Sequence, residues 1–176
     1  APGLTSVQSA AVAVSGVPSP STSTITAPAT LVAGQDGTVR VTLRSAGGTA
    51  VPGVPVSLAM SGESNTISPS SATTNGSGEA SFTVQSTVSG ERTVTASAEG
   101  VTIGPVGLTI VPGAPSPERT VADVGDGRRF RQTVIIVETR DAFGNRVTAG
   151  GAGVAAEITD GPNEDFSVDV VDRGDG

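Results

Sequence analysis

The chain of 176 residues contains no cysteine, histidine, lysine, tryptophan or tyrosine. Without cysteine and histidine it lacks the usual ligands of zinc and copper, and it cannot build the Ser-His or Cys-His pairs of nucleophilic enzymes. Without lysine it cannot form Schiff bases. These absences exclude most enzyme classes, so we expect a protein that is not an enzyme and that carries no organic cofactor.

The charge balance and the scarcity of aromatic residues exclude further functions. All ten positive charges are arginines, and seventeen acidic residues give a net charge of −7. Such a chain is poorly suited to nucleic acid. The four phenylalanines offer no stacking surface for nucleotide strands or sugars. No run of about 18 apolar residues exists, so we expect no membrane insertion in this segment.

An internal repeat is the most informative feature that is present. Residues 1–21 align without a gap with residues 98–118, so the period is 97 residues. Eight positions are identical: Ala1/Ala98, Gly3/Gly100, Thr5/Thr102, Val14/Val111, Gly16/Gly113, Pro18/Pro115, Ser19/Ser116 and Pro20/Pro117. This period is too long for a solenoid repeat and close to the length of one immunoglobulin-like sandwich. The chain is therefore expected to belong to a tandem array of whole domains.

Alternating apolar and polar residues between glycine- and proline-rich turns predict an all-β fold. The pattern predicts seven strands in the complete repeat, within STSTITA, TVRVTLR, VPVSLAM, NTISPSS, EASFTVQS, RTVTASAEG and TIGPVGLTIV. In TVRVTLR, for example, Val39, Val41 and Leu43 share one face, which is expected to be buried. About fifteen such inward positions are enough for a small domain that folds alone.

The linkers GVPSPS and GAPSP separate three regions. Residues 1–17 are interpreted as the last strand of a preceding domain and its linker, residues 18–113 as a complete domain, and residues 114–176 as a linker and an incomplete domain. Proline fixes its own φ and restricts the preceding residue, so these linkers are expected to be semi-rigid spacers.

Two family resemblances emerge from these segments. Residues 22–111, with ITAPATLVAGQDGTVRVTLRSAGGTAVPGVPVSLAM, SPSSATTNGSGEASFTV and RTVTASAEGV, closely resemble the group 1 bacterial immunoglobulin-like domains of the invasin and intimin type. The third region, with VIIVETRDAFGNRVTAGGAGVAAEI and DFSVDVVDRGDG, resembles a filamin-type immunoglobulin-like repeat. The resemblances imply tandem immunoglobulin-like β-sandwiches, located outside the cell or on the bacterial surface, whose partners are neighbouring domains and a host or surface receptor.

The two ends of the chain suggest an assembly hypothesis. An isolated strand leaves its backbone donors and acceptors unpaired, so residues 1–16 are expected either to be disordered or to pair with another chain. Their apolar side chains are the candidate interaction residues: Leu4, Val7, Val12 and Val14. The third region ends inside the DRGDG turn at Gly176 and lacks about three strands of a sandwich. Residues 118–176 are therefore expected to need a partner, to need the rest of their own chain, or to be only partly ordered.

Several short motifs suggest binding sites. Acidic turns of the third region supply oxygen ligands for a calcium hypothesis, with the candidates Asp123, Asp126, Asp160, Glu164 and Asp165. Arg173–Asp175 spell the integrin tripeptide RGD, but the surrounding glycines and aspartates are those that a tight turn requires. The basic run at 127–131 is interpreted as a solvated strand edge, and the segment Asp141–Asn145 as a hairpin turn without chemistry.

Three functions remain open at this level. The first is a stalk or spacer in a bacterial surface or secreted adhesin, favoured by domain-length repeats and proline-bearing joints. The second is a subunit of an extracellular fibre, in which residues 1–16 complete the third region of a neighbouring, identical chain by strand addition. The third is an accessory module of a secreted enzyme or a phage virion protein, because sandwiches of this class occur in both.

Overall fold

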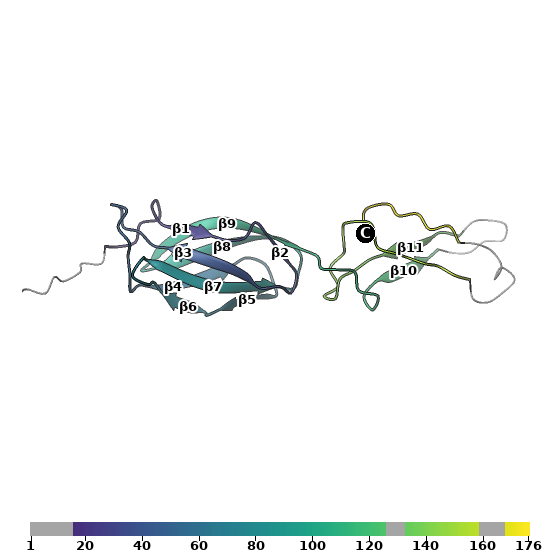
Figure 1. Cartoon of the computed structure of the whole chain (residues 1–176), viewed down its shortest axis with the longest axis horizontal. Coiled ribbons are helices and arrows are strands. Elements are labelled where there is room, and N and C mark those ends of the chain that lie inside the picture. The colour runs from purple at the N-terminus through teal and green to yellow at the C-terminus, as the bar shows by residue number, and fades with distance from the viewer. Residues whose placement is uncertain (1–15, 126–132, 159–167) are drawn as a thin grey trace, which may run out of the picture.

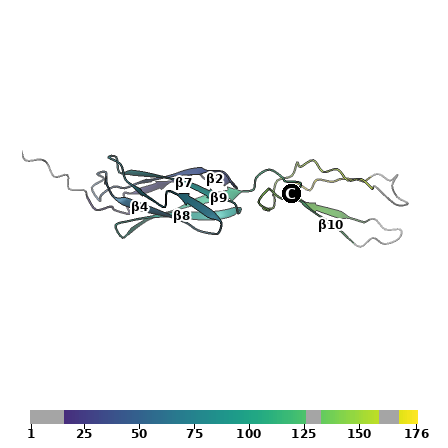
Figure 2. The same cartoon turned by 90° about the horizontal axis from the view of Figure 1, so that it is seen from below.

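The computed structural model of the protein describes residues 16–125, 133–158 and 168–176. Within these ranges the chain forms eleven β-strands, and no stretch is helical. The strands make two units that lie end to end, so the molecule is elongated in both views (Figures 1 and 2). In the part of the chain that the structure describes, no helix could cross a membrane.

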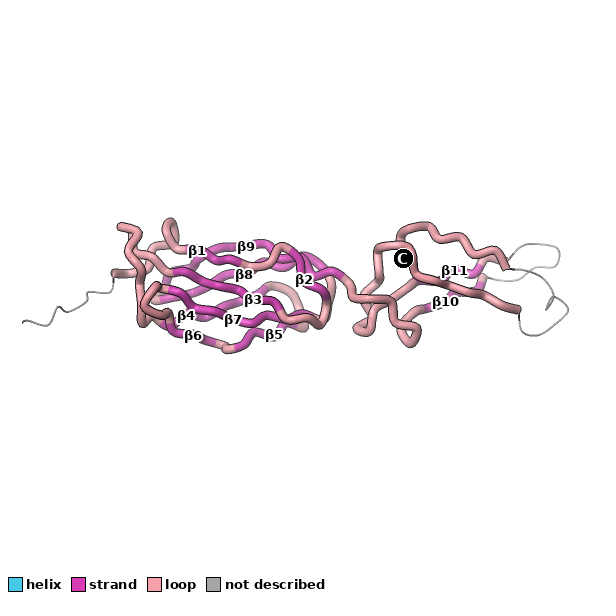
Figure 3. The backbone as a smooth tube through the Cα atoms, in the orientation of Figure 1, coloured by secondary structure: helices cyan, strands magenta, loops and turns pink. Residues whose placement is uncertain are grey.

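The larger unit, which we call the central sandwich, consists of two sheets (Figure 3). The four-stranded sheet has the order β1-β3-β7-β5, with β1 at Thr24–Thr26, β3 at Gly37–Thr42, β7 at Glu79–Ser86 and β5 at Asn65–Ser68. The five-stranded sheet has the order β2-β9-β8-β4-β6, with β2 at Thr30–Val32, β9 at Val101–Val111, β8 at Gly90–Ala98, β4 at Pro55–Met60 and β6 at Ser71–Thr73. All pairs are antiparallel except β2 with β9.

The alternation of the sequence places the core where it was expected. Val39 of β3 lies opposite Phe82 of β7, and both side chains are buried between the sheets. The eighteen buried residues of this core all lie between Ile25 and Ile110. Because no described residue of the third region belongs to this core, the central sandwich has the means to fold on its own.

The central sandwich has nine strands where seven were predicted. At two places the chain leaves one sheet and continues as a further strand in the other sheet. After β1, which pairs with β3, the chain passes Pro28 and continues as β2 beside β9. After β5, which pairs with β7, it passes Pro69 and continues as β6 beside β4. Proline has no N–H to donate to a sheet, so it interrupts the pairing at both crossings.

The third region is less complete. It contains one hairpin, formed by β10 at Val121–Val124 and β11 at Ile135–Glu138, which pair antiparallel. Four large apolar side chains of this hairpin are exposed: Val121, Val124, Ile135 and Ile136. Exposed apolar side chains that lie together are a candidate contact surface.

One apolar segment of the third region lies outside the hairpin. The segment at 153–158, GVAAEI, forms no strand. Gly150, Gly151 and Gly153 precede it or open it, and glycine weakens a strand because it has no side chain to pack. No strand among the described residues pairs with this segment.

Candidate functional site: the joint between the two units

Most of the binding residues proposed from the sequence lie outside the described residues. This holds for the basic run at 127–131 and for the apolar positions of the first segment, which are Leu4, Val7, Val12 and Val14. It also holds for four calcium candidates: Asp126, Asp160, Glu164 and Asp165. The fifth, Asp123, is exposed on β10. Across the described ranges no three acidic side chains gather into a cation site, so calcium binding stays a hypothesis.

In the RGD segment the backbone bends at Gly174. The Asp172 carboxylate accepts hydrogen bonds from the backbone N–H groups of Gly174 at 2.8 Å and Gly151 at 2.6 Å. These bonds hold the pKa of Asp172 below its usual range. The Asp175 carboxylate lies 3.7 Å from the guanidinium of Arg146. Both carboxylates therefore have partners within the chain.

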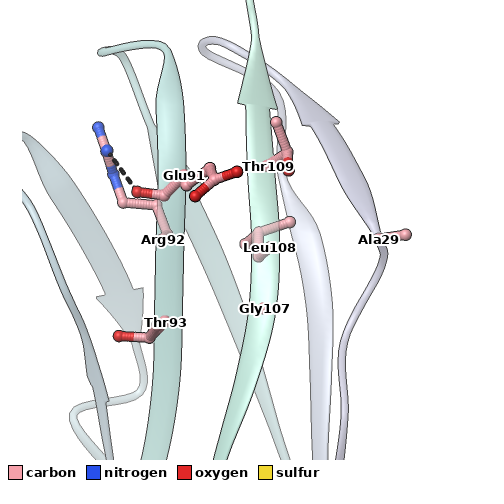
Figure 4. A pocket seen from close by; sticks show the side chains of 7 residues that line it. All are labelled: Ala29, Glu91, Arg92, Thr93, Gly107, Leu108 and Thr109. Atoms are coloured by element: carbon pink, nitrogen blue, oxygen red, sulfur yellow. Dashed lines mark hydrogen bonds between the residues drawn. The ribbon is translucent and has the colours of Figure 1, made fainter.

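The outer face of β8 and β9 carries a shallow groove (Figure 4). It is lined by Ala29, Glu91, Arg92, Thr93, Gly107, Leu108 and Thr109. These residues supply one carboxylate, and their other ionisable group, the Arg92 guanidinium, donates to the backbone carbonyls of Glu91 and Val88. The groove therefore lacks the paired groups that proton-transfer catalysis needs.

The most elaborate polar cluster lies at the joint between the central sandwich and the third region. It is built on the turn Asp141–Asn145, whose flanking residues Arg140 and Arg146 form an isolated β-bridge. The side chain of Asp141 is only 1% exposed. Its Oδ1 accepts the backbone N–H groups of Phe143 at 2.9 Å and Asn145 at 2.8 Å. These two bonds fix the shape of the turn.

The second carboxylate oxygen of Asp141 reaches out of the turn. Its Oδ2 accepts the side-chain N–H of Asn145 at 2.8 Å and the backbone N–H of Gly113 at 2.9 Å. Gly113 follows β9 and belongs to the linker. A single carboxylate thus holds both its own turn and the point where the chain leaves the central sandwich.

The environment of Asp141 favours its charged form. Burial alone would raise its pKa, but the hydrogen bonds from Asn145, Gly113 and Phe143 more than offset that effect, so the pKa lies below the usual aspartate value. Hydrogen bonds to a charged acceptor are also stronger than neutral ones. Asp141 is therefore an ionised anchor at neutral pH.

Asn145 connects the turn to the body of the central sandwich. Its Nδ2 donates to the backbone carbonyl of Thr87 at 2.9 Å, and its Oδ1 accepts the backbone N–H of Ser89 at 2.9 Å. One amide group therefore pairs with two backbone groups, as a neighbouring strand would.

Phe143 adds an apolar contact to the joint. Its ring lies on Gly34, where an added Cβ would come within 2.4 Å of the ring atoms Cε2 and Cζ. Gly34 also has φ +79°, a conformation that other residues rarely adopt. We call Asp141, Phe143 and Asn145 the joint clamp, and we call Gly34, Thr87–Ser89 and Gly113 the receiving pole.

The receiving pole is braced from inside the central sandwich. The guanidinium of Arg92, a residue only 8% exposed, donates from Nη2 to the Val88 carbonyl at 2.7 Å. The buried hydroxyl of Ser86 lies 3.3 Å from the same carbonyl. Arg92 also bonds back to the carbonyl of Glu91 at 3.1 Å (Figure 4). These contacts position the backbone groups that Asn145 binds.

Sequence reasoning predicted the turn but missed its role. Asp, Gly and Asn are typical turn residues, and they explain the hairpin by themselves. The available signal was Phe143, because an aromatic side chain in the middle of a surface turn has no turn-forming purpose. Aromatic residues are enriched where surfaces meet.

A family model decides how the central sandwich is classified. The model of the bacterial Ig-like domain (group 1) matches residues 19–111, which is more than half of the chain. The chain belongs to this family. The match confirms the resemblance of residues 22–111 to group 1 domains, and the two-sheet sandwich confirms the immunoglobulin-like fold class.

Three solved structures share this fold over about three quarters of the chain. Invasin, a bacterial integrin-binding protein, matches with a TM-score of 0.63 and 19% identity over 76% of this chain and 29% of its own. InvD of Yersinia pseudotuberculosis matches with a TM-score of 0.59 and 17% identity over 75% of this chain and 44% of its own. The adhesin InvE of the same organism matches with a TM-score of 0.54 and 18% identity over 72% of this chain and 36% of its own.

These likenesses show the fold, and their extent is limited. The chain spans less than half the length of each of the three structures. A filamin domain is also matched, at a TM-score of 0.42, which is too low to carry an argument about the third region. A search of curated protein sequences found no match.

Proposed function

We propose that this chain is a stalk or spacer segment of a bacterial cell-surface or secreted adhesin. Its role is to hold sandwiches in line, and it performs no catalysis. The observation that carries the proposal is the joint clamp, which is a built contact between consecutive units. The family match and the likeness to invasin and InvE, an adhesin, support the adhesin context.

The joint resists bending because it has two separate attachments. The covalent connection runs from β9 through Gly113, and the clamp adds hydrogen bonds to Thr87 and Ser89 on a different strand connection. A single linker allows rotation about itself, whereas two attachments side by side oppose it. Pro112 and Pro115 on either side of Gly113 restrict the linker further.

Receptor binding is assigned to other parts of the protein. The joint uses its polar groups internally, and the groove on β8 and β9 carries few groups for recognition. We therefore propose that this segment presents a receptor-binding module outside the cell, as its relation to surface adhesins suggests. The RGD turn is not assigned an integrin-binding role, because Asp175 is already paired with Arg146.

The stalk proposal is tested by measuring how widely the two units move relative to each other. The chain has no cysteine, so spin labels at Ser97→Cys and Thr148→Cys, both exposed positions, report one distance without background. We expect a narrow distance distribution in the full chain and a broad one after Asn145→Ala. A broad distribution in the otherwise unchanged chain would contradict a stiff spacer.

A second candidate function is supported by the exposed hairpin of the third region. Val124 and Ile136 are 62% and 55% exposed on β10 and β11, and a fibre subunit would cover them with a strand from a neighbour. Sedimentation velocity over a concentration series separates the two functions. Growing assemblies that disappear when residues 1–16 are deleted favour the fibre, and a monomer at all concentrations favours the stalk.

A further inference from the structure

The turn of the joint clamp has a structural counterpart at the opposite end of the central sandwich, in Ser45–Thr49. In both turns the first residue's N–H donates to the last residue's carbonyl, at 2.9 Å for Asp141 and Asn145 and at 2.8 Å for Ser45 and Thr49. In both, an arginine just before the turn donates to the fourth residue's carbonyl, at 2.8 Å for Arg140 and 3.0 Å for Arg44. The two turns have the same backbone design.

The chain that leads into each unit is repeated as well. Ser116 N–H donates to the carbonyl of Arg140 at 2.6 Å, and Ser19 N–H donates to the carbonyl of Arg44 at 2.8 Å. A hydroxyl then supports each arginine's backbone N–H, from Thr120 at 3.4 Å and from Ser23 at 3.0 Å. The entry to the central sandwich is therefore built like the entry to the third region.

The glycine of each linker occupies the same place. Gly113 lies against Asp141, with an added Cβ at 3.7 Å from the Asp141 Cβ. Gly16, its match in the 97-residue repeat, lies against Ser45, with an added Cβ at 2.8 Å from the Ser45 Cβ. The turn Ser45–Thr49 thus stands beside its incoming linker as the clamp turn does.

The side chains of the two turns differ at the three positions that form the clamp. Ser45 stands where Asp141 does, Gly47 where Phe143 does, and Thr49 where Asn145 does. A hydroxyl lacks the second acceptor oxygen and the charge of a carboxylate, and glycine has no ring. Threonine has no amide that can donate to a carbonyl and accept an N–H at the same time.

We propose that the Ser45–Thr49 end of the central sandwich receives a preceding sandwich of the same kind, and that this joint is a hinge because its turn lacks the clamp side chains. The surface that it fits is a pole like the receiving pole at Gly34, Thr87–Ser89 and Gly113. The similarity of the incoming linker, residues 14–20, to the linker at 111–117 supports this occupant. Five of the seven positions are repeated: Val14, Gly16, Pro18, Ser19 and Pro20. Stiff and flexible joints would then be specified by three side chains of one turn.

This inference rests on the proposed stalk function and goes beyond it. A stalk with only clamped joints is rigid throughout, whereas a clamped joint next to an unclamped one bends at a defined place. Such a stalk would keep its end module at a fixed angle to one sandwich and still let the pair reorient. The inference therefore predicts a difference in flexibility between two joints, which can be measured in one molecule that contains both.

The test uses a tandem chain in which residues 16–112 precede residues 16–176, so that Gly16 of the second copy takes the place of Gly113 after the first copy. The central sandwich has its own core, so the added copy is expected to fold. Spin-label pairs across each joint give two distance distributions. We expect the first joint to show at least twice the width of the second.

A gain of stiffness tests the three positions directly. Ser45→Asp, Gly47→Phe and Thr49→Asn together, in the second copy, are expected to narrow the first joint to the width of the second. The reverse set, Asp141→Ser, Phe143→Gly and Asn145→Thr, is the matched control and should widen the second joint to that of the first. Thermal unfolding of the central sandwiches should be unchanged within a few degrees in both variants.

The outcomes separate this inference from the stalk proposal. If the unaltered first joint is as narrow as the second, the hinge is wrong while the stiff stalk stands. If the grafted residues leave the first joint broad, the Ser45–Thr49 end is not a docking surface of this kind. If the second joint is itself broad and the reverse set does not change it, the clamp fails and the stalk proposal fails with it.

Discussion

The central sandwich and the third region both contain strands rich in valine and isoleucine, but they bury them differently. In the central sandwich eighteen apolar side chains form one core between two sheets. In the described part of the third region the buried residues are Thr139, Asp141 and Val147, all near the joint, whereas Val124 and Ile136 on the hairpin are exposed. Packing organises the first unit, and hydrogen bonding at one end organises the second.

This contrast shows what a polar cluster can do where a core is incomplete. Asp141 and Asn145 make three hydrogen bonds to Gly113, Thr87 and Ser89 of the other unit. A neutral hydrogen bond contributes roughly 0.5–1.5 kcal/mol and one to a charged group roughly 1.5–3 kcal/mol. The joint is therefore stable by a few kcal/mol at most, which is enough to favour one orientation without preventing opening under load.

The largest predicted effect comes from the core of the central sandwich. Phe82→Ala should lower the free energy of unfolding by about 3–5 kcal/mol, because it leaves a cavity between the two sheets. Ile136→Ala in the exposed hairpin is the matched control and should change it by less than about 0.5 kcal/mol. Urea unfolding followed by circular dichroism measures both. A large effect of Ile136→Ala would show that the hairpin is covered in solution, and would break the comparison.

The next effect concerns the anchor of the joint. Asp141→Asn should destabilise the closed joint by about 1–3 kcal/mol, because an amide places a donor against the N–H groups that the carboxylate accepts. Amide hydrogen exchange at Gly113, Phe143 and Asn145 should accelerate, while exchange in β3 and β7 stays unchanged. Asp175→Asn, an exposed aspartate of the same region, is the control. Faster exchange in β3 and β7 would mean that the two units are not independent.

How much of the structure could be predicted from the sequence depends on whether side-chain or backbone atoms make the contacts. The burial of Val39, Val41 and Leu43 follows from the two-residue period of a strand, so this part of the core was predicted correctly. The crossings at Pro28 and Pro69 were missed, because a proline in such a run signals an interruption without saying which sheet the chain joins next.

The joint could not be derived from the sequence for a different reason. The partners of Asp141 and Asn145 in the receiving pole are the backbone groups of Gly113, Thr87 and Ser89. Every residue but proline carries the same backbone donor and acceptor, so no letter of the sequence marks these positions as partners. The calcium hypothesis and the strand-exchange hypothesis stay predictions, since most of their residues lie outside the described ranges.

The joint should also respond to acid, and the central sandwich should respond less. The folded pKa of Asp141 is lowered, so its carboxylate stabilises the closed joint above the ordinary aspartate pKa of about 4. That contribution is lost as the pH falls through the lowered folded value. The label distance between residues 97 and 148 should therefore be narrow at neutral pH and broad in acid. In Asp141→Asn the distance distribution should be broad at neutral pH and in acid. A pH response of equal size in that variant would show that other carboxylates cause the response.

The smallest predicted effect tests whether Phe143 and Gly34 act as a pair. Phe143→Ala should weaken the joint by about 1 kcal/mol, since the ring is 51% exposed and loses one contact face. Gly34→Ala should also weaken it, because the new Cβ would lie where the ring now is and because φ at this position is +79°. In the double variant the ring is absent, so the new Cβ at residue 34 meets no clash. The stability lost in the double variant should therefore be smaller than the sum of the losses in the two single variants. If the loss in the double variant equals the sum of the two single losses, the cost at Gly34 is backbone strain alone, and the ring does not rest on this glycine in solution.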